Sequence, residues 1–273
     1  MKIVLVAVLA VLWMATAIAQ DQSDAQDQSG AQEQSGRVWV LPLEFDYDFG
    51  AANGNAFITR AIPTNTLLIR DDWKLINLAL ITIADAPGGV PGSPGNPEPV
   101  PGPSTFGLGD LTDALLFTWN TNGKLMLGAG AAFNLPIATD EVLGSGKWQV
   151  GPAIRVAYQA PNWRFGLLAA NRWSFAGDSD RADVNQLLLR GLIRRELRNR
   201  WFFISAPIIT ANWNAASGQK WRVPLGGGFG RALSRDRAPV NVSLQLYWNV
   251  IRPDGAPDWL ARVGVTFPFQ LPE

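Results

Sequence analysis

The sequence predicts an all-β protein that forms a closed antiparallel transmembrane β-barrel of about 12 strands. The first observation behind this fold class is a hairpin at 147–177, in which Trp148 and Tyr158 bracket one strand and Trp163 and Trp173 bracket the next. A spacing of ten residues puts both aromatic rings on one face of a strand. Ten residues tilted by about 40° rise about 25 Å, the height of the lipid-facing band between two aromatic girdles.

The second observation is that this spacing recurs. The further aromatic pairs lie ten or twelve residues apart on a shared parity, and they are Trp39 and Phe49, Trp201 and Trp213, and Trp259 and Phe269. Strand ends in any β-protein collect some aromatic residues, which is the alternative interpretation. The shared length favours a membrane barrel, because strands of soluble proteins usually span only about five or six residues.

The N-terminus has the features of a secretory signal. Lys2 is followed by an apolar run to about Met14 and by the sequence AIA at 17–19, so we expect a signal peptide at 1–19 and a mature chain from Gln20. Residues 21–36 form an imperfect repeat (DQSDAQ, DQSGAQ, EQSG) without large apolar side chains, which predicts a disordered low-complexity tail over 20–36. The barrel domain is then 37–273.

Composition excludes several classes of protein. The formal net charge of zero argues against a nucleic-acid partner, and the absence of cysteine excludes disulfides and a lipoprotein anchor. The longest apolar run after the signal, 75–84, is far shorter than the roughly 20 residues of a membrane-spanning helix. A helical membrane protein is therefore not expected.

Alternation of apolar and polar residues places the individual strands. We predict them at 38–49, 55–68, 73–84, 108–120, 124–135, 148–158, 163–175, 183–197, 201–213, 221–232, 240–251 and 259–269. An even number lets both chain ends lie on the periplasmic side of the barrel.

Connection lengths are the third observation. Short turns are expected on the periplasmic side and longer loops outside. The predicted turns are 69–72, 121–123, 159–162, 198–200 and the longer 233–239; the predicted external loops are 85–107, 136–147, 176–182, 214–220 and 252–258, with the short 50–54 as an exception. The Pro- and Gly-rich loop 85–107 is either a solvated loop or a lid folded into the pore.

The strand 240–251 shows which parity faces lipid. Leu244, Leu246 and Trp248 share one face, and Gln245 and Asn249 lie on the other. Outer-membrane barrels are apolar outside and polar inside, and girdle aromatics belong on the lipid face. A secreted soluble lipid-binding barrel uses the same alternation with the apolar face inside, and it remains an alternative.

This parity predicts a charged pore lining. The candidate pore-lining residues are Glu44, Asp46, Asp48, Arg155, Arg164, Arg172, Arg190, Arg194, Arg222 and Arg262, together with Gln149, Gln186 and several glycines. Because buried charges of this number need water or partners, we expect an interior that is at least partly wet.

Most catalytic chemistry has no residues to support it. The chain contains no histidine and no cysteine, so Ser-His hydrolase sites, thiol nucleophiles and the usual zinc sites are not expected, and we predict no enzyme, no cofactor and no metal. The stretch LGSGKW at 143–148 lacks the first P-loop glycine and the Ser or Thr after Lys147. Asp178, Asp180 and Asp183 do not follow the EF-hand pattern, which favours a solvated loop.

Ordered motifs along the chain carry a family resemblance. They are GLGD (107–110), NLPIAT (134–139), LGSGKW (143–148), GP (151–152), WSFAGD (173–178), ITANW (209–213), GQKW (218–221), VPLGGG (223–228) and PVNVSLQ (239–245). From Leu41 to the C-terminus the chain resembles the outer-membrane transporter family named after the meta-pathway of phenol degradation (MetA-pathway phenol degradation-like).

The resemblance implies a β-barrel in the outer membrane of a Gram-negative bacterium that passes small organic compounds, often aromatic ones. Such barrels usually end on an aromatic residue that the barrel assembly machinery recognises. Here QLPE at 270–273 follows Phe269, so the assembly signal is displaced by four residues.

We therefore expect an outer-membrane pore or facilitator for small organic, aromatic or anionic solutes, in contact with outer-membrane lipid and of unassigned oligomeric state. Seven arginines against three acids on the predicted wall favour anionic or aromatic-acid solutes over cations. The alternatives are arginines that only meet headgroups or water at strand ends, and a structural or surface-interaction barrel without transport.

Overall fold

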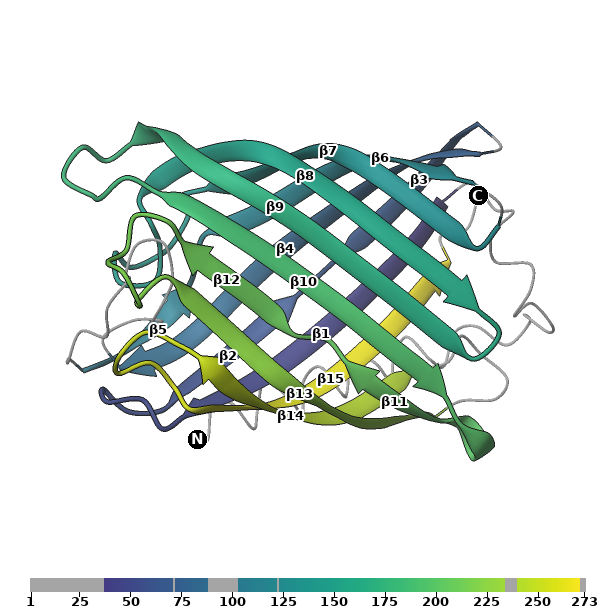
Figure 1. Ribbon diagram of the computed structural model, residues 1–273. Helices are drawn as coiled ribbons and strands as arrows, with labels where there is room; N and C mark the ends of the chain where they lie inside the picture. Colours follow the sequence, from purple (N-terminus) through teal and green to yellow (C-terminus); the bar gives the residue numbers. More distant parts are fainter. Residues whose placement is uncertain (1–36, 71, 88–102, 122, 234–239, 271–273) are drawn as a thin grey trace.

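The computed structural model shows a closed β-barrel with strongly tilted strands (Figure 1). It describes residues 37–70, 72–87, 103–121, 123–233 and 240–270. The predicted signal peptide and low-complexity tail lie outside these residues and stay predictions.

Fifteen strand segments build the barrel wall. They are β1 (Arg37–Phe49), β2 (Ala56–Ala61), β3 (Thr64–Arg70), β4 (Trp73–Pro87), β5 (Ser104–Leu108), β6 (Leu111–Asn120), β7 (Leu125–Leu135), β8 (Lys147–Ala160), β9 (Trp163–Gly177), β10 (Asn185–Glu196), β11 (Trp201–Ser205), β12 (Ile208–Asn212), β13 (Trp221–Ala232), β14 (Asn241–Ile251) and β15 (Trp259–Gln270).

Three of the predicted strands are each interrupted once. β2 and β3 are separated at Ile62 and Pro63, β5 and β6 at Gly109 and Asp110, and β11 and β12 at 206–207. Proline explains two of the breaks, because it has no N–H to donate to the neighbouring strand. With each interrupted pair counted as one strand, the wall has twelve strands, which confirms the predicted fold class.

Pairing between the first and last strands closes the barrel. Residues 38–49 of β1 pair antiparallel with 259–270 of β15, and all other strand pairs are antiparallel as well. Strands that follow one another in the chain are neighbours in the wall. This arrangement leaves the described sheet without a free edge, as a membrane-spanning sheet requires.

Short turns gather at one end of the barrel and longer loops at the other (Figure 1). Residues 161–162 join β8 and β9, and a single 3-10 turn, Arg198–Arg200, joins β10 and β11. Residues 136–146, 178–184, 213–220 and 252–258 connect strands at the opposite end. The predicted loop 85–107 is partly strand, since Asp85 pairs with Phe106 and Pro87 with Ser104; its proposed role as a lid falls on undescribed residues.

The two faces of the wall follow the predicted parity. On β14, Leu244 and Trp248 are 66% and 52% exposed, whereas Gln245 and Asn249 are 4% and 2% exposed. The apolar residues point outward, so the alternative of a soluble barrel with an apolar interior is wrong.

Aromatic side chains form contacts near both ends of the outer surface. Trp73 stacks on Trp119 at the turn end, with ring centroids 6.2 Å apart. At the loop end Trp259 lies between Phe49 and Trp248, at 6.5 and 6.3 Å. These are the positions of the girdles that anchor a barrel at the membrane interfaces.

One polar pair interrupts the apolar outer surface. Asp113 of β6 shares its parity with the exposed Phe117, and it accepts two hydrogen bonds from Asn77 of β4, at 2.8 and 2.9 Å. The amide thereby satisfies both carboxylate oxygens on the outer face.

The interior is less uniformly polar than the sequence suggested. The walls of β4 and β6–β9 contribute a buried apolar cluster made of Ile76, Ala114, Leu116, Ala132, Ala153, Leu168 and Ala170. The expected wet, charged lining therefore covers only part of the barrel, and an apolar wall faces it.

Among the residues that the structure covers, no helix combines the length and the apolar character needed to cross a membrane.

The outer surface generates a first prediction. Leu244→Arg puts a charge on the apolar outer face and should lower the free energy of unfolding by about 2–4 kcal/mol. Leu233→Arg, at an exposed position just beyond β13 at the turn end, should cost less than about 1 kcal/mol. Urea unfolding of the protein folded into lipid vesicles measures both values. An equal cost for the two variants would mean that Leu244 does not face hydrocarbon. Gln245 is not a suitable control position, because its side chain lies within a buried polar network.

Candidate functional site

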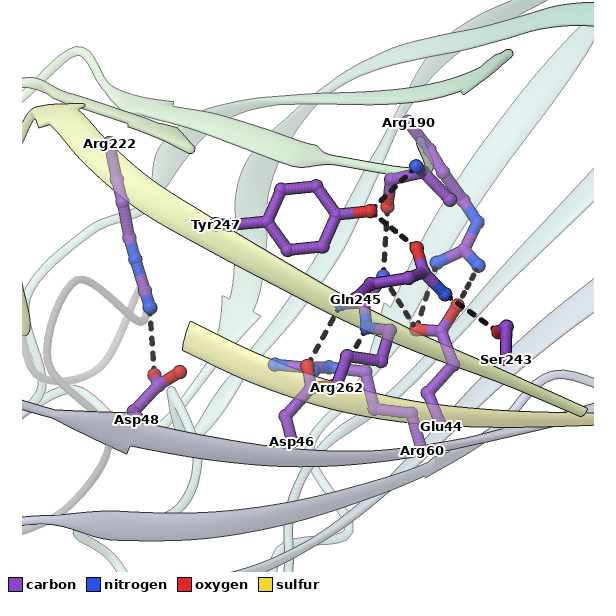
Figure 2. A network of polar contacts seen from close by, with 11 residues as sticks. Glu44, Asp46, Asp48, Arg60, Arg190, Arg222, Ser243, Gln245, Tyr247 and Arg262 are labelled. Atoms are coloured by element: carbon purple, nitrogen blue, oxygen red, sulfur yellow. Dashed lines mark hydrogen bonds and ion pairs between the residues drawn. The ribbon is translucent and has the colours of Figure 1, made fainter. Parts of the chain in front are cut away.

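Three carboxylates of β1 point into the barrel. Glu44, Asp46 and Asp48 alternate along the strand, which puts them on one face, and their exposed fractions are 5%, 0% and 0%. Carboxylates so far from water are tolerated only when cations and hydrogen-bond donors surround them. Four arginines do so here, and we call the seven side chains, which are Glu44, Asp46, Asp48, Arg60, Arg190, Arg222 and Arg262, the acid–arginine cluster (Figure 2).

Arg262 is at the centre of this cluster. It is the direct partner of Asp46 in the β1–β15 register, and its Nε and Nη2 donate to the two carboxylate oxygens at 2.7 and 2.8 Å. Its Nη1 donates to the carbonyl of Ala206 at 2.8 Å and lies 3.4 Å from Glu44. Arg60 of β2 binds Asp46 from the other side. The two-point contact of Arg262 with Asp46 is the geometry in which a guanidinium group binds a carboxylate most strongly.

Two further arginines reach β1 from strands that do not neighbour it. Arg190 of β10 binds Glu44, and Arg222 of β13 donates to Asp48 at 2.7 Å. Between β10 and β1 lie four strands in one direction round the barrel, so the Arg190–Glu44 pair spans the lumen. The cluster therefore ties opposite walls together and fills part of the interior.

A polar network on β14 covers the break between β11 and β12. The Tyr247 hydroxyl accepts a hydrogen bond from the amide of Ala206 at 2.7 Å and donates to Gln245, whose amide donates to Ser243 at 3.0 Å (Figure 2). The interrupted strand thus keeps its buried backbone groups satisfied from inside the barrel.

A second polar centre joins the connection 136–146 to the barrel wall. Asp110, at the break between β5 and β6, accepts hydrogen bonds from the amide and hydroxyl of Ser145 at 2.8 and 2.6 Å and from Asn134 at 2.9 Å. Ser145 and Asn134 are 1% and 3% exposed. The connection, predicted as an external loop, folds into the mouth of the barrel.

Packing and a clamp hold this inward connection in place. Leu143 packs among buried residues of β2 and β4, including Ile58 and Ala84. Arg181, in the next loop, donates to the carbonyls of Glu141 and Gly144, both at 2.6 Å. A Cβ on Gly144 would lie 2.4 Å from both Ala138 and Asp110, so the close approach needs glycine.

Arg172 of β9 lies beside this second centre. It is 3% exposed, and its Nη1 donates to Thr112 at 2.8 Å and to Asn134 at 3.1 Å, while Nη2 donates to Gln186 at 3.3 Å. Its described partners are all neutral, and its Nε has no hydrogen-bond partner.

The described part of the barrel interior contains a larger and a smaller cavity. The larger has a volume of about 180 Å³, and its walls include Arg60, Arg172, Arg222, Arg262 and Asp110. The smaller has about 30 Å³ and a mostly apolar wall that includes Arg190. Both share one wall, formed by Leu80, Thr112, Arg172, Leu188 and Ile208. About 30 Å³ is the share of one water molecule in liquid water.

The structure separates the candidate pore-lining residues into groups. Arg172, Arg222 and Arg262 line the larger cavity and Arg190 the smaller, whereas Glu44, Asp46 and Asp48 are bound to arginines and line neither. Gln149 and Gln186 are buried at 1% and 3% exposure.

The other three arginines have different surroundings. Arg155 contacts the Met126 sulfur at 3.1 Å, and Arg194 binds Glu196 and lies 3.7 Å from the centre of the Phe202 ring. Arg164 is exposed near the short turn of β8 and β9, although it has interior parity. None of the three lines the two cavities, and a pore-lining role for any candidate stays a prediction.

The sequence reasoning missed several residues that complete the site. Arg60 shares its parity with the buried Ile58, so the alternation of β2 contained the signal. Asp110, Asn134 and Ser145 belong to three separate motifs of the family resemblance, GLGD (107–110), NLPIAT (134–139) and LGSGKW (143–148). Only the inward fold of 136–146 brings them together.

Within the described ranges, no group of three or more His, Cys, Asp or Glu side chains is placed to hold a metal ion.

A profile of the protein family described as "Putative MetA-pathway of phenol degradation" matches residues 27–269. This chain belongs to that family. Comparison with curated proteins gives no match.

Solved structures show what fold this family member shares. The COG4313 outer membrane channel from Pseudomonas putida F1 superposes with a TM-score of 0.60 at 14% identity, covering 90% of this chain and all of that one. The porin NanC superposes with a TM-score of 0.54 at 13% identity, and the match covers 85% of this chain and all of NanC. The chain therefore shares the fold of outer-membrane β-barrels. The first of these proteins is described as a channel and the second as a porin.

The acid–arginine cluster generates a second prediction. Asp46→Ala removes the carboxylate that Arg60 binds and the two-point partner of Arg262, which keeps only Glu44 at 3.4 Å, and it should lower the free energy of unfolding by about 3–5 kcal/mol. Glu196→Ala, which breaks the more exposed pair with Arg194, should cost less than about 1 kcal/mol. Urea unfolding followed by tryptophan fluorescence measures both. A loss below about 1 kcal/mol for Asp46→Ala would contradict the account.

The inward connection generates a third prediction. Hydrogen bonds from a charged donor contribute about 1.5–3 kcal/mol each, so Arg181→Ala should raise the fraction of barrels with 136–146 withdrawn by more than about tenfold. We expect more frequent high-conductance openings in planar bilayers. Arg252→Ala removes an arginine that binds Asp258 in another loop at the same end, and it should change nothing. Identical openings in Arg181→Ala and wild type would show that the clamp does not hold the mouth closed.

Proposed function

We propose that the protein is an outer-membrane channel of a Gram-negative bacterium that passes small organic solutes, with a preference for anionic and aromatic ones. The observation that carries the proposal is the larger cavity, which lies inside a closed barrel with an apolar outer face and is lined by both charged and apolar side chains. Outer-membrane lipid covers the outer face, and the barrel assembly machinery inserts the chain. Family membership and the channel fold support this function.

The charge preference follows from which groups reach the cavity. Four guanidinium groups and one carboxylate line it, because the acids of β1 lie behind the arginines that bind them. A solute thus meets the positive partner of each pair first. Guanidinium groups bind carboxylates through two hydrogen bonds and stack on aromatic rings.

The apolar part of the wall supports organic rather than inorganic solutes. Ile58, Leu80, Leu188, Ile208 and Leu260 share the cavity with the arginines. A cavity of about 150 Å³ can hold benzene, so about 180 Å³ suits a single ring.

One observation favours the second candidate, a structural or surface-interaction barrel without transport. The Arg190–Glu44 pair spans the lumen, and the cavity beside it has only about 30 Å³. In this conformation the interior holds small molecules without offering them a wide path. Passage therefore requires movement of the wall or of residues 136–146.

Flux measurements decide between the two candidates. Purified barrel in liposomes should admit phenol-sized neutral solutes and benzoate faster than empty liposomes, and Arg181→Ala should admit them faster still. Protein that is folded, as judged by its heat-modifiable mobility on gels, but gives no flux in either form would support the structural role instead.

Reversal potentials in a salt gradient test the charge preference. Wild type should be anion-selective, and Arg222→Gln should shift the reversal potential toward cations, because Asp48 loses its partner at the cavity wall. Arg164→Gln, at an exposed position away from both cavities, is the control and should not shift it. Cation selectivity in wild type would refute the preference.

A further inference from the structure

We infer that Arg172 is the centre of a saturable binding site for a small monocarboxylate with a compact apolar body, in the wall shared by the two cavities. The inference rests on the proposed function. It goes further because a channel requires only a route for the solute, whereas this inference assigns a specific binding site on that route.

The first argument is the unbalanced hydrogen bonding of Arg172. The guanidinium group has five N–H donors. Three described contacts use them, all to neutral oxygens of Thr112, Asn134 and Gln186, and Nε has no partner. The four arginines of the acid–arginine cluster, in contrast, each bind a carboxylate. Arg172 is 3% exposed and donates hydrogen bonds only to neutral oxygens, although Asp110 lies close enough to attract it. It thus has a free donor and no bound carboxylate, which suits it to an anion.

The second argument concerns the other charges near the site. Asp110 shares the cavity and opposes an anion. Its Oδ2 accepts three hydrogen bonds, from the amide and hydroxyl of Ser145 and from Asn134, whereas its buried Oδ1 has no hydrogen-bond partner among the described residues. Asn134 stands between the two charges, donating to Asp110 and accepting from Arg172. Arg60, Arg222 and Arg262 line the same cavity; each is paired with a β1 carboxylate, but it is the guanidinium groups and not those acids that line the cavity. The balance at the cavity surface favours an anion.

The third argument is the apolar surface next to Arg172. Leu80, Leu188 and Ile208 line both cavities together with it. A carboxylate bound at Arg172 would lie at the wall shared by the two cavities, and the rest of the molecule would contact these apolar side chains. The volume of about 180 Å³ limits that remainder to about one six-membered ring.

Calorimetric titration of the full-length folded barrel in detergent micelles tests the site, with benzoate as the probe. We expect one saturable site per chain, with affinity at least about tenfold higher than for benzyl alcohol, which lacks the charge, and higher than for acetate, which lacks the ring. Equal affinity for benzoate and benzyl alcohol, or for benzoate and acetate, would overturn the inference.

Variants then assign the site to this residue. Arg172→Gln should weaken benzoate binding at least about tenfold, and Arg172→Lys should recover part of it, because the charge remains while the two-point geometry is lost. Arg164→Gln is the matched control and should bind like wild type. Unchanged binding by Arg172→Gln would exclude the site.

Two further measurements keep the test independent of folding and of transport. If Arg172→Gln does not fold, the salt dependence of wild type decides. Benzoate affinity should fall when chloride is raised from 0.1 to 1 M, whereas benzyl alcohol affinity should not, because the screening length drops from about 10 Å to about 3 Å. The same salt dependence for both compounds would refute the site. Benzoate binding without flux would end the channel proposal and leave the site standing. Benzoate flux without binding that depends on Arg172 would exclude the site and leave the channel proposal standing.

Discussion

The structure depends on one electrostatic constraint, the compensation of three carboxylates that β1 carries into the barrel. Glu44, Asp46 and Asp48 are almost completely withdrawn from water, and each unpaired charge there would cost several kcal/mol. Their partners come from β2, β10, β13 and β15, so the strands can satisfy the charges only when the barrel is closed in the correct register. The hydrophobic effect drives the outer face toward lipid without fixing this register, whereas the two-point contact of Arg262 with Asp46 specifies it.

The same constraint shapes the space that remains inside. Because Arg190 and Arg222 cross to β1, part of the lumen is filled by ion pairs, and the cavities lie between this cluster and the apolar walls of β4 and β6–β9. The strand break at Ala206 belongs to this arrangement, since its carbonyl binds Arg262 and its amide binds Tyr247. The arginines that tie the barrel walls together thus also line the two cavities.

The mouth of the barrel is held by hydrogen bonds and apolar packing rather than by ion pairs, because a backbone segment folds inward there and binds side chains of the wall. Residues 136–146 enter the lumen because Asp110 accepts the Ser145 donors, Leu143 finds an apolar pocket and Gly144 leaves room for both. Arg172 lies directly behind this contact, joined to Asp110 through Asn134. The connection and the cavity wall therefore form one hydrogen-bonded unit.

The sequence by itself determined the fold class, the strand order and the orientation of the side chains. A period of two with aromatic residues ten positions apart is a local property, so Leu244 and Gln245 could be assigned to opposite faces without any tertiary information. Glu44, Asp46 and Asp48 were assigned to the interior for the same reason. Parity could not tell how far along the axis a side chain lies, which is why Arg164 was grouped with Arg172 although only the latter reaches a cavity.

Only the tertiary structure decided which charges meet and which stay without an opposite partner. Arg190 is separated from Glu44 by 146 positions and Arg262 from Asp46 by 216, and such pairs depend on the closure of the barrel rather than on any local pattern. The inward course of 136–146 was hidden as well, because a loop that is buried by long-range contacts has the composition of a solvated one. Sequence alternation predicts the face of the sheet on which a residue lies. The radius, tilt and register of the closed barrel determine which side chains face it across the lumen.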